Sequence, residues 1–326
     1  MMPLWRTMKV VRTHEDFVLD AHEKYILTAL SKDIRYSRKR LSSRLKISEQ
    51  LVGYKIKKLI EQQVIYPSLI LDFKSFNLDI WIILATHLTS KEIKAVEEHS
   101  TTYLAEELLG EYHYLCVHVS SQLSPFIKEL YSESDIKIIP INRQHSDEFN
   151  GYNIKDFSKE YAAQEETEQQ AIDKYEKILI QKLAETPDAS FSELSKRTGI
   201  SRSIIAKRYY SLFEKNIILK NRYACDIYKM GFEAYILIIH ILPKDYAKIT
   251  YTLINNRNSG HLYGNPNTLI LNYICLNNTD LQHMISLLKN SFRVTISVFQ
   301  NSGTYHINTF PKSILEKLTI KKKYPK

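Results

Sequence analysis

Two segments of the chain repeat one pattern of residues. Residues 20–65 align without a gap on residues 173–218. In each copy, apolar residues at helical spacing predict a short helix, a turn and two further helices, followed by an apolar strand hairpin. Chance rarely produces this whole order twice at one spacing, so each copy supports the other. The repeat predicts two winged helix-turn-helix heads that read DNA.

The distribution of charge agrees with this prediction. The chain has 326 residues, enough for several domains, and a formal net charge of +9. Basic residues exceed acidic ones in 20–75, in 173–231 and after 311, whereas acidic residues dominate 79–111 and 143–172. Neutralising phosphates with clustered cations releases counterions and drives binding to nucleic acid. We therefore expect double-stranded DNA as the partner.

Other features exclude several classes of protein. No apolar run approaches the roughly 20 residues of a membrane span, and the basic N-terminus lacks the apolar core of a secretory signal. Cys116, Cys225 and Cys275 lie far apart in apolar surroundings, which indicates packed thiols in a reducing cytoplasm. Metal-ligand spacings, a P-loop and a GxSxG motif are absent from the sequence. We expect a cytoplasmic, nucleoid-associated protein without a metal or cofactor.

In the first head, the third helix should bury Val52, Ile56 and Leu59 and present its opposite face to DNA. Ser37 and Ser48 have the type and position of helix N-caps. Gly53 costs about 1 kcal/mol relative to alanine in mid-helix, which a close approach of the backbone to DNA would explain. The expected DNA contacts of this head are Ser37, Arg38, Lys39, Ser48, Glu49, Gln50, Gly53, Tyr54, Lys55 and Lys57.

In the second head, Ser190 and Glu193 form a capping box, and Ser201 caps a third helix that buries Ile205, Tyr209 and Leu212. Arg202 and Lys207 can donate to guanine edges or to phosphates. Lys55 and Arg208, at equivalent positions, are expected phosphate clamps, and Lys220, Asn221 and Arg222 are expected at a wing tip. The expected DNA contacts are Ser190, Ser201, Arg202, Ser203, Ala206, Lys207, Arg208, Tyr210, Lys220 and Arg222.

After each head the pattern changes to strand, helix, strand, strand, helix, strand. This order folds as a ferredoxin-like βαββαβ domain, whose open sheet face can pair with another. The predicted fold class is therefore α+β, with two winged helix-turn-helix domains alternating with two ferredoxin-like domains. The expected divisions are an N-terminal extension (1–19), head 1 (20–76), ferredoxin-like domain 1 (77–142), a linker with a helix (143–172), head 2 (173–231), ferredoxin-like domain 2 (232–310) and a basic tail (311–326).

This order of domains resembles the Lrp/AsnC (feast/famine) transcription regulators. The matching segments are ILTALSKD, LSSRLKIS, VGYKIKKLIEQQVI, Gly110-Glu111-Tyr112, LSKRTGIS, IIAKRYYSLFEKNIIL and Gly264. Family members usually hold one unit per chain and dimerise, so the resemblance implies that this fused chain is its own pseudo-dimer, with further homodimerisation left open. Because the two heads differ at their outward positions, we expect an asymmetric operator. The resemblance also implies a small-molecule effector at the domain interface, near Gly110, Tyr112 and Gly264.

Two alternatives remain open. Some proteins of this two-module build are similar to siroheme decarboxylases, which would need histidines and arginines to converge between the paired domains. His87, His113, His118, His240 and His261 lie on or near predicted strands, although lone strand histidines are usually packed or surface groups. A DNA-packaging protein with little sequence preference is the other alternative. Because a decarboxylase gains nothing from basic recognition helices, we expect a regulator and not an enzyme.

Overall fold

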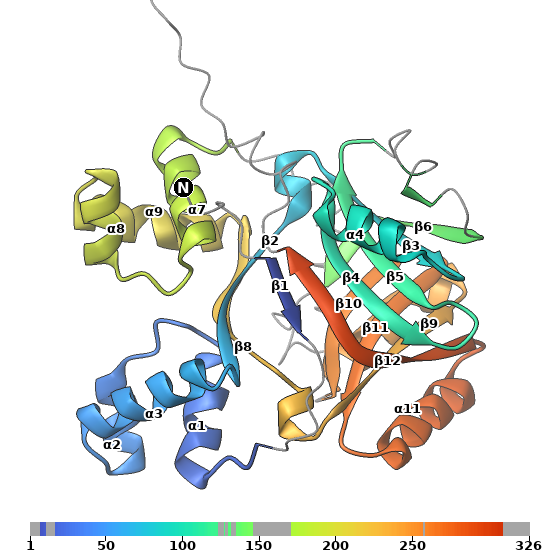
Figure 1. Cartoon of the computed structure of the whole chain (residues 1–326), viewed down its shortest axis with the longest axis horizontal. Coiled ribbons are helices and arrows are strands. Elements are labelled where there is room, and N and C mark those ends of the chain that lie inside the picture. Colours follow the sequence, from blue (N-terminus) through green and yellow to red (C-terminus); the bar gives the residue numbers. More distant parts are fainter. Residues whose placement is uncertain are drawn as a thin grey trace, which may run out of the picture.

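A computed structural model gives the fold of residues 7–10, 17–122, 127, 130–131, 135–145, 171–256 and 258–308. Two helical heads lie at one end of the molecule, and a large β-sheet built from both units lies at the other (Figure 1). The α+β class with tandem helix-turn-helix and ferredoxin-like parts is thus confirmed. The predicted linker helix and the basic tail fall on 146–170 and 309–326, outside the described residues.

Each head is a three-helix unit, and the two units match element by element. Head 1 consists of α1 (Ala21–Leu30), α2 (Arg38–Leu45) and α3 (Glu49–Glu61), and head 2 of α7 (Lys174–Glu185), α8 (Phe191–Thr198) and α9 (Arg202–Glu214). The first helix of each begins with a capping box, Asp20 with Glu23 and Asp173 with Glu176. The predicted caps Ser48, Ser190 and Ser201 all accept hydrogen bonds from the helix backbone, whereas Ser37 occupies the N-cap position without one.

The residue that ends the second helix is a glycine in one head and a lysine in the other. Gly199 ends α8 in the left-handed conformation, with φ of 71°. At the equivalent position of head 1, Lys46 ends α2 with φ of 54°. A side chain in this conformation costs roughly 1–2 kcal/mol, a cost that glycine does not have.

Replacing Lys46 by glycine is therefore expected to stabilise head 1 by about 0.5–1 kcal/mol, after the larger chain entropy of glycine is subtracted. Urea denaturation of the full chain measures the change. Gly199→Lys is the reciprocal variant and should destabilise head 2 by a similar amount. Equal stability of all three proteins would contradict the role assigned to the left-handed turn.

The strands that follow the heads do not form the predicted hairpins. Instead β2 (Ile65–Leu71) pairs antiparallel with β8 (Ile218–Cys225), so that one ribbon joins the two heads (Figure 1). Lys220, Asn221 and Arg222 lie within β8, opposite Ile70, Leu69 and Ser68, and do not form a wing tip. The reason is apolar burial, because Leu69, Ile70 and Leu71 are at most 6% exposed in the ribbon and would face water in isolated hairpins.

In the described residues, one sheet of ten strands forms the other end of the molecule, and its two parts are called here the first and the second sheet. The first contains β3 (Asp79–Ala85), β4 (Thr102–Leu109), β5 (Tyr114–Ser120) and β6 (Ile136–Ile141), with α4 (Ser90–Glu98) on its outer face. The second contains β9 (Glu233–His240), β10 (Ser259–Asn265), β11 (Thr268–Cys275) and β12 (Thr295–Asn308), with α10 (Tyr246–Ile254) and α11 (Asn278–Ser291) on its outer face. The helix expected after β5 lies largely outside the described residues. Short 3-10 helices span Phe73–Phe76, Tyr228–Met230 and Pro243–Asp245.

The last strand of each unit pairs with a strand of the other unit. β12 pairs with β9 up to Gln300 and with β4 from Gln300 onward, and a bulge interrupts the β4 pairing between Asn301 and Tyr305. β7 (Arg143–His145) follows β6 and pairs with β10. Gly303 occupies the β12 bulge with φ of 92°, a conformation suited to glycine. The N-terminal extension adds β1 (Thr7–Val10), which the sequence did not predict and which pairs with the end of β12. The two units form a pseudo-dimer within one chain.

The inner faces of the two sheets share one core. Along β3, Ile80, Ile82 and Leu84 face inward, whereas Ile83 and Ala85 face the outer helices. β9 alternates in the same way, which explains why both strands read as continuous apolar runs. In the described parts of the chain, no helix is long and apolar enough to cross a membrane, and no group of three or more histidine, cysteine or acidic residues is placed to hold a metal.

Candidate functional site

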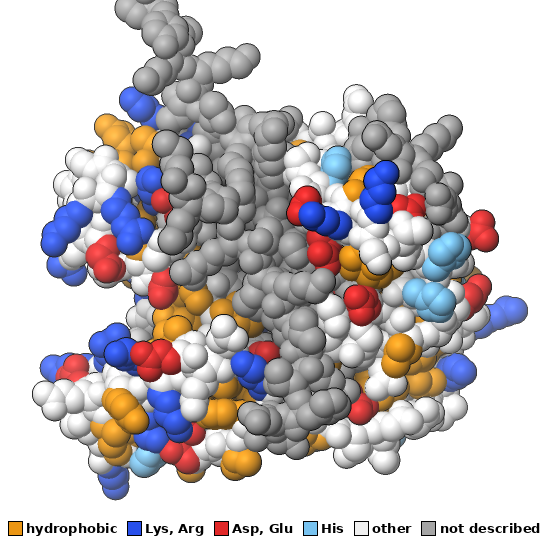
Figure 2. Space-filling view, viewed as in Figure 1, with side chains coloured by type: hydrophobic (Ala, Val, Ile, Leu, Met, Phe, Trp, Pro, Cys, Tyr) orange, Lys and Arg blue, Asp and Glu red, His pale blue; other side chains and the backbone are white. Residues whose placement is uncertain are grey.

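The third helix of each head presents an exposed face. On α9, Arg202, Ser203, Lys207 and Tyr210 are exposed, and Ala206 is half-buried beside them. On α3 the exposed residues are Glu49, Gln50, Tyr54 and Lys57, with Gly53 half-buried. Leu51 and Ile204, at equivalent positions, are also exposed, although we did not include them among the expected contacts. Figure 2 shows basic side chains on both heads, around the hollowed side between them.

The first turn of α2 carries an unusual concentration of positive charge. Arg38, Lys39 and Arg40 are all exposed, this turn contains no acidic residue, and Ser37 makes no side-chain cap bond. Cations are unfavourable at a helix N-terminus, where the helix dipole and free N–H groups favour anions. The negative charge of a phosphate bound there would neutralise these cations and interact favourably with the helix dipole.

The two expected phosphate clamps are held within the heads. Lys55 Nζ lies 2.5 Å from the Asp20 carboxylate, and Arg208 lies 2.9 Å from the Asp173 carboxylate. Both aspartates cap the first helix of their head, so the pairs tie α3 to α1 and α9 to α7. The pair with Lys55 lowers the pKa of Asp20. Both cations thus have a partner inside the protein, and their contact with phosphate stays a prediction.

Contacts across the ribbon hold the two heads together. The Arg35 guanidinium of head 1 lies 4.1 Å from the ring centroid of Phe191 and 4.4 Å from that of Tyr209, both in head 2. Its Nη2 donates to the carbonyl of Ala189. Asn221 of the ribbon is 2% exposed and donates to Tyr209 Oη and to the carbonyl of Pro187. The exposed faces of α3 and α9 are therefore held in a fixed arrangement relative to one another.

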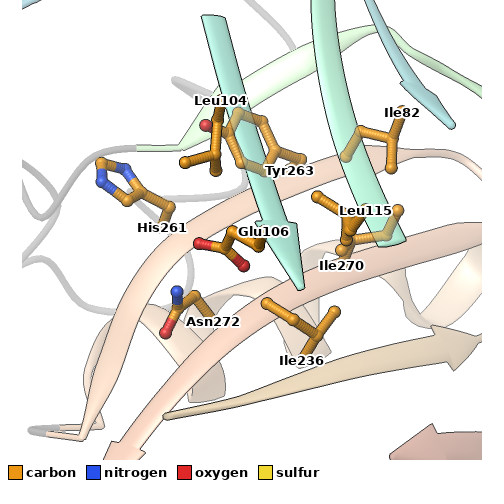
Figure 3. A pocket seen from close by; sticks show the side chains of 9 residues that line it. All are labelled: Ile82, Leu104, Glu106, Leu115, Ile236, His261, Tyr263, Ile270 and Asn272. Atoms are coloured by element: carbon orange, nitrogen blue, oxygen red, sulfur yellow. The ribbon is translucent and has the colours of Figure 1, made fainter. Parts of the chain in front are cut away.

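A second candidate site lies between the inner faces of the two sheets. It is a small hollow of about 10 Å³, room for roughly one water molecule, and it is partly open to solvent. Its walls are Ile82, Leu104, Leu115, Ile236 and Ile270, and its polar side chains come from Glu106, His261, Tyr263 and Asn272. Glu106 comes from β4 of the first unit, whereas the other three polar residues come from β10 and β11 of the second. Figure 3 shows the Glu106 carboxyl directed toward the side of the hollow where His261 and Asn272 lie.

The electrostatics of this hollow are dominated by burial. Glu106 is 4% exposed, and desolvation raises the pKa of its carboxyl to about 7, against a smaller opposing effect of the Asn301 side chain. Burial also raises the pKa of Tyr263 well above its usual value. Among the polar atoms, Glu106 Oε2, Tyr263 Oη and Asn272 Oδ1 have no hydrogen-bond partner in the structure.

The predicted effector residues lie elsewhere. Gly110 and Tyr112 pack on Phe299 of β12, with the Tyr112 ring edge-on at 5.8 Å. Gly264 is tightly packed, since a Cβ there would lie 2.4 Å from Tyr246 Oη, and its carbonyl accepts from the Asn142 amide. These residues mark the two junctions between the units, and none of them lines the hollow.

The five strand histidines do not converge on one site. His118 is fully buried, with Nε2 2.7 Å from Tyr131 Oη, and burial lowers its pKa to about 3. His87 and His113 are exposed, and His240 is half-buried beside Thr268. Of the five, His261 alone lines the hollow.

Sequence reasoning overlooked Glu106, the carboxyl group in the lining of the hollow. A signal was available, because Glu106 lies between the apolar residues Leu104 and Leu108 on one face of β4. A carboxylate at an inward position of a core strand is rare unless it has a partner or a function.

Comparison with known proteins identifies the fold. The sequence matches no protein-family model and no curated protein. Two solved structures of the siroheme decarboxylase NirDL, one in complex with an iron-uroporphyrin III analogue, are 12% identical and cover 87% of this chain, with TM-scores of 0.54 and 0.53. They are themselves covered to 91% and 92%. LrpC of B. subtilis is 20% identical, with a TM-score of 0.36, and covers 40% of this chain and 99% of its own.

The expectation that a chain of this build is not an enzyme is wrong. The likeness that extends over 87% of the chain is to a decarboxylase. Basic recognition helices do not argue against catalysis, because one architecture can host unrelated functions and function depends on the site. What the likeness shows is a tandem arrangement of helix-turn-helix and ferredoxin-like parts shared with that enzyme.

Proposed function

We propose that the chain binds double-stranded DNA through its two heads and regulates transcription from a site with two unlike halves. The observation that carries the proposal is the exposed basic surface on both heads, Arg38, Lys39 and Arg40 on α2 with Arg202 and Lys207 on α9. Cations of this kind neutralise phosphates, and third-helix side chains reach base edges in a major groove.

The fixed arrangement of the two heads supports binding to a DNA site of one defined length. Two helices held at one separation match half-sites at one spacing, which for neighbouring major grooves is roughly 34 Å. The outward residues of α3 and α9 differ, Glu49 and Gln50 against Arg202 and Ser203, so a palindrome would satisfy only one head.

Fluorescence anisotropy of the full chain with labelled duplex DNA tests the proposal. Binding should weaken as salt rises, with a slope of about 0.9 per phosphate contact in a log–log plot. Footprinting on genomic fragments should then give one discrete protected region with two unlike halves. Uniform coverage would instead indicate packaging, and the absence of any complex in dilute buffer would refute DNA binding altogether.

The structural likeness to NirDL over most of the chain supports a siroheme-type activity. However, the residues that line the hollow do not suit such a substrate. A tetrapyrrole of the uroporphyrin type carries several carboxylates, which proteins bind with arginine and lysine. The described lining contains a carboxylate, Glu106, and no arginine or lysine. A Soret band shift on addition of an iron-uroporphyrin to the purified chain would restore this candidate.

A further inference from the structure

The third helix of each head lacks half of a capping box that four other helices complete. A capping box needs glutamate or glutamine at the third helical position, where the side chain accepts from the N-cap amide. In the described chain this glutamate follows the N-cap of four helices, as Glu23 in α1, Glu92 in α4, Glu176 in α7 and Glu193 in α8. In α3 and α9 the N-caps are Ser48 and Ser201, but the third position holds Leu51 and Ile204.

These two aliphatic side chains are partly left in water at equivalent positions of the repeat. Leu51 is 39% exposed and Ile204 is 41% exposed. Their own amides donate to the N-cap hydroxyls, at 3.1 Å in head 1 and 3.4 Å in head 2, so the cap holds the start of each side chain in place. One exposed leucine on a protein surface is ordinary. The same departure in both heads, whose preceding residues differ, indicates a role that the two heads share.

Neither helix stability nor charge alone explains the aliphatic residue. Glutamate at this position would complete the box and interact favourably with the helix dipole, although its carboxylate would repel DNA phosphates. Glutamine would complete the box without a charge. An aliphatic side chain is preferable to glutamine only where it meets an apolar group of a partner. In the major groove this apolar group is the C5-methyl of thymine, and the N-terminal residues of a recognition helix reach the base edges there.

We propose that Leu51 and Ile204 each contact the methyl group of a thymine in the major groove. The two half-sites, although unlike elsewhere, would then share a thymine at the same position relative to their heads. This inference rests on the proposed binding of DNA and adds to it a base that each head selects. It concerns the methyl group alone, so it can fail while DNA binding holds.

Deoxyuridine tests the contact without any change to the protein, because it lacks only the methyl group of thymidine. Duplexes that bind the full chain are first selected from a random pool, and each thymine of the selected site is then replaced in turn. Fluorescence anisotropy should show an affinity about fourfold lower for one replacement in each half-site, at equivalent positions. This is the change expected for one buried methyl-sized group.

Alanine variants assign each methyl contact to a side chain. Leu51→Ala shortens an exposed side chain within a helix, so it should leave folding nearly unchanged. In this variant the methyl effect should disappear from one half-site and remain in the other, and Ile204→Ala should show the reverse. Leu287→Ala is the matched control, because Leu287 is 42% exposed on α11, outside the heads, and both methyl effects should remain.

Three results would overturn the inference while DNA binding by the heads stands. These are selected duplexes without a shared thymine, an affinity that no deoxyuridine replacement changes, and methyl effects that persist in both Leu51→Ala and Ile204→Ala. The absence of any complex with duplex DNA in dilute buffer would instead refute the proposed function, and this inference with it. The two failures are therefore distinguishable.

Discussion

Replacing Arg38, Lys39 and Arg40 together by alanine is expected to weaken binding to duplex DNA on the order of 100-fold at about 50 mM salt. These side chains are exposed at the start of α2, where no acidic residue balances them and where a bound phosphate would meet the helix N-terminus. The slope of log affinity against log salt should fall by about 3, one contact being lost for each cation.

The control for this variant lies on the opposite part of the molecule. Lys244, Lys248 and Lys289 are exposed beside or on the outer helices α10 and α11, and their replacement by alanine removes the same net charge. If only the local surface of the heads matters, the control should retain nearly full affinity and slope. Equal losses in both variants would mean that DNA responds to the overall charge and that α2 has no special role.

A substitution on the third helix of the second head is expected to change which DNA sequences are bound. Arg202→Ala is expected to relax the preference for particular bases in one half-site if Arg202 contacts a base edge, at a cost of about 1–3 kcal/mol in discrimination. If Arg202 contacts phosphate instead, all sequences should weaken alike and the salt slope should fall by about 1. Selection of bound duplexes from a random pool distinguishes these outcomes.

The second large effect concerns stability and pH. Glu106→Gln is expected to raise the free energy of unfolding at pH 8 by up to about 3 kcal/mol, with little change near pH 4.5. The folded state holds a proton on Glu106 up to about pH 7, whereas the unfolded state releases it near pH 4.5. Folding of the unaltered chain therefore loses stability as pH rises from about 4.5 to 7, and glutamine, which never ionises, removes this loss.

Urea denaturation at a series of pH values between 5 and 8 measures the difference. Glu107→Gln is the control, because it removes the neighbouring, half-exposed carboxyl on the other side of β4. Parallel curves for the Glu106→Gln variant and the unaltered chain would show that the Glu106 carboxyl ionises as easily in the folded state as in the unfolded one.

Local sequence signals predicted the elements well, because they follow from short-range physics. Helix spacing and capping residues fixed the two heads, and the buried residues Val52, Ile56 and Leu59 were expected from their period. Pairing between distant strands could not be predicted in the same way. β2 and β8 read as hairpins in isolation, and only the burial gained across the heads makes them partners.

The candidate sites show the same limit. Exposure of Arg202 and Lys207 followed from helix geometry, whereas the partners of Lys55 and Arg208 depend on how the first helix packs on the third. The hollow escaped prediction because it combines Glu106 of one unit with Tyr263 and Asn272 of the other. Its polar groups come together only when the two sheets meet, which no local pattern reveals.

Fusion of the two units in one polypeptide changes which side chains can line the hollow between them. In a dimer of identical subunits, every residue on the twofold interface occurs twice, so any carboxyl beside the axis faces a copy of itself or is duplicated across it. Here Glu106 stands opposite Tyr263 and Asn272, which belong to a different half of the same chain. Covalent linkage thus frees the interface from symmetry, so that the two sides of one hollow carry different side chains.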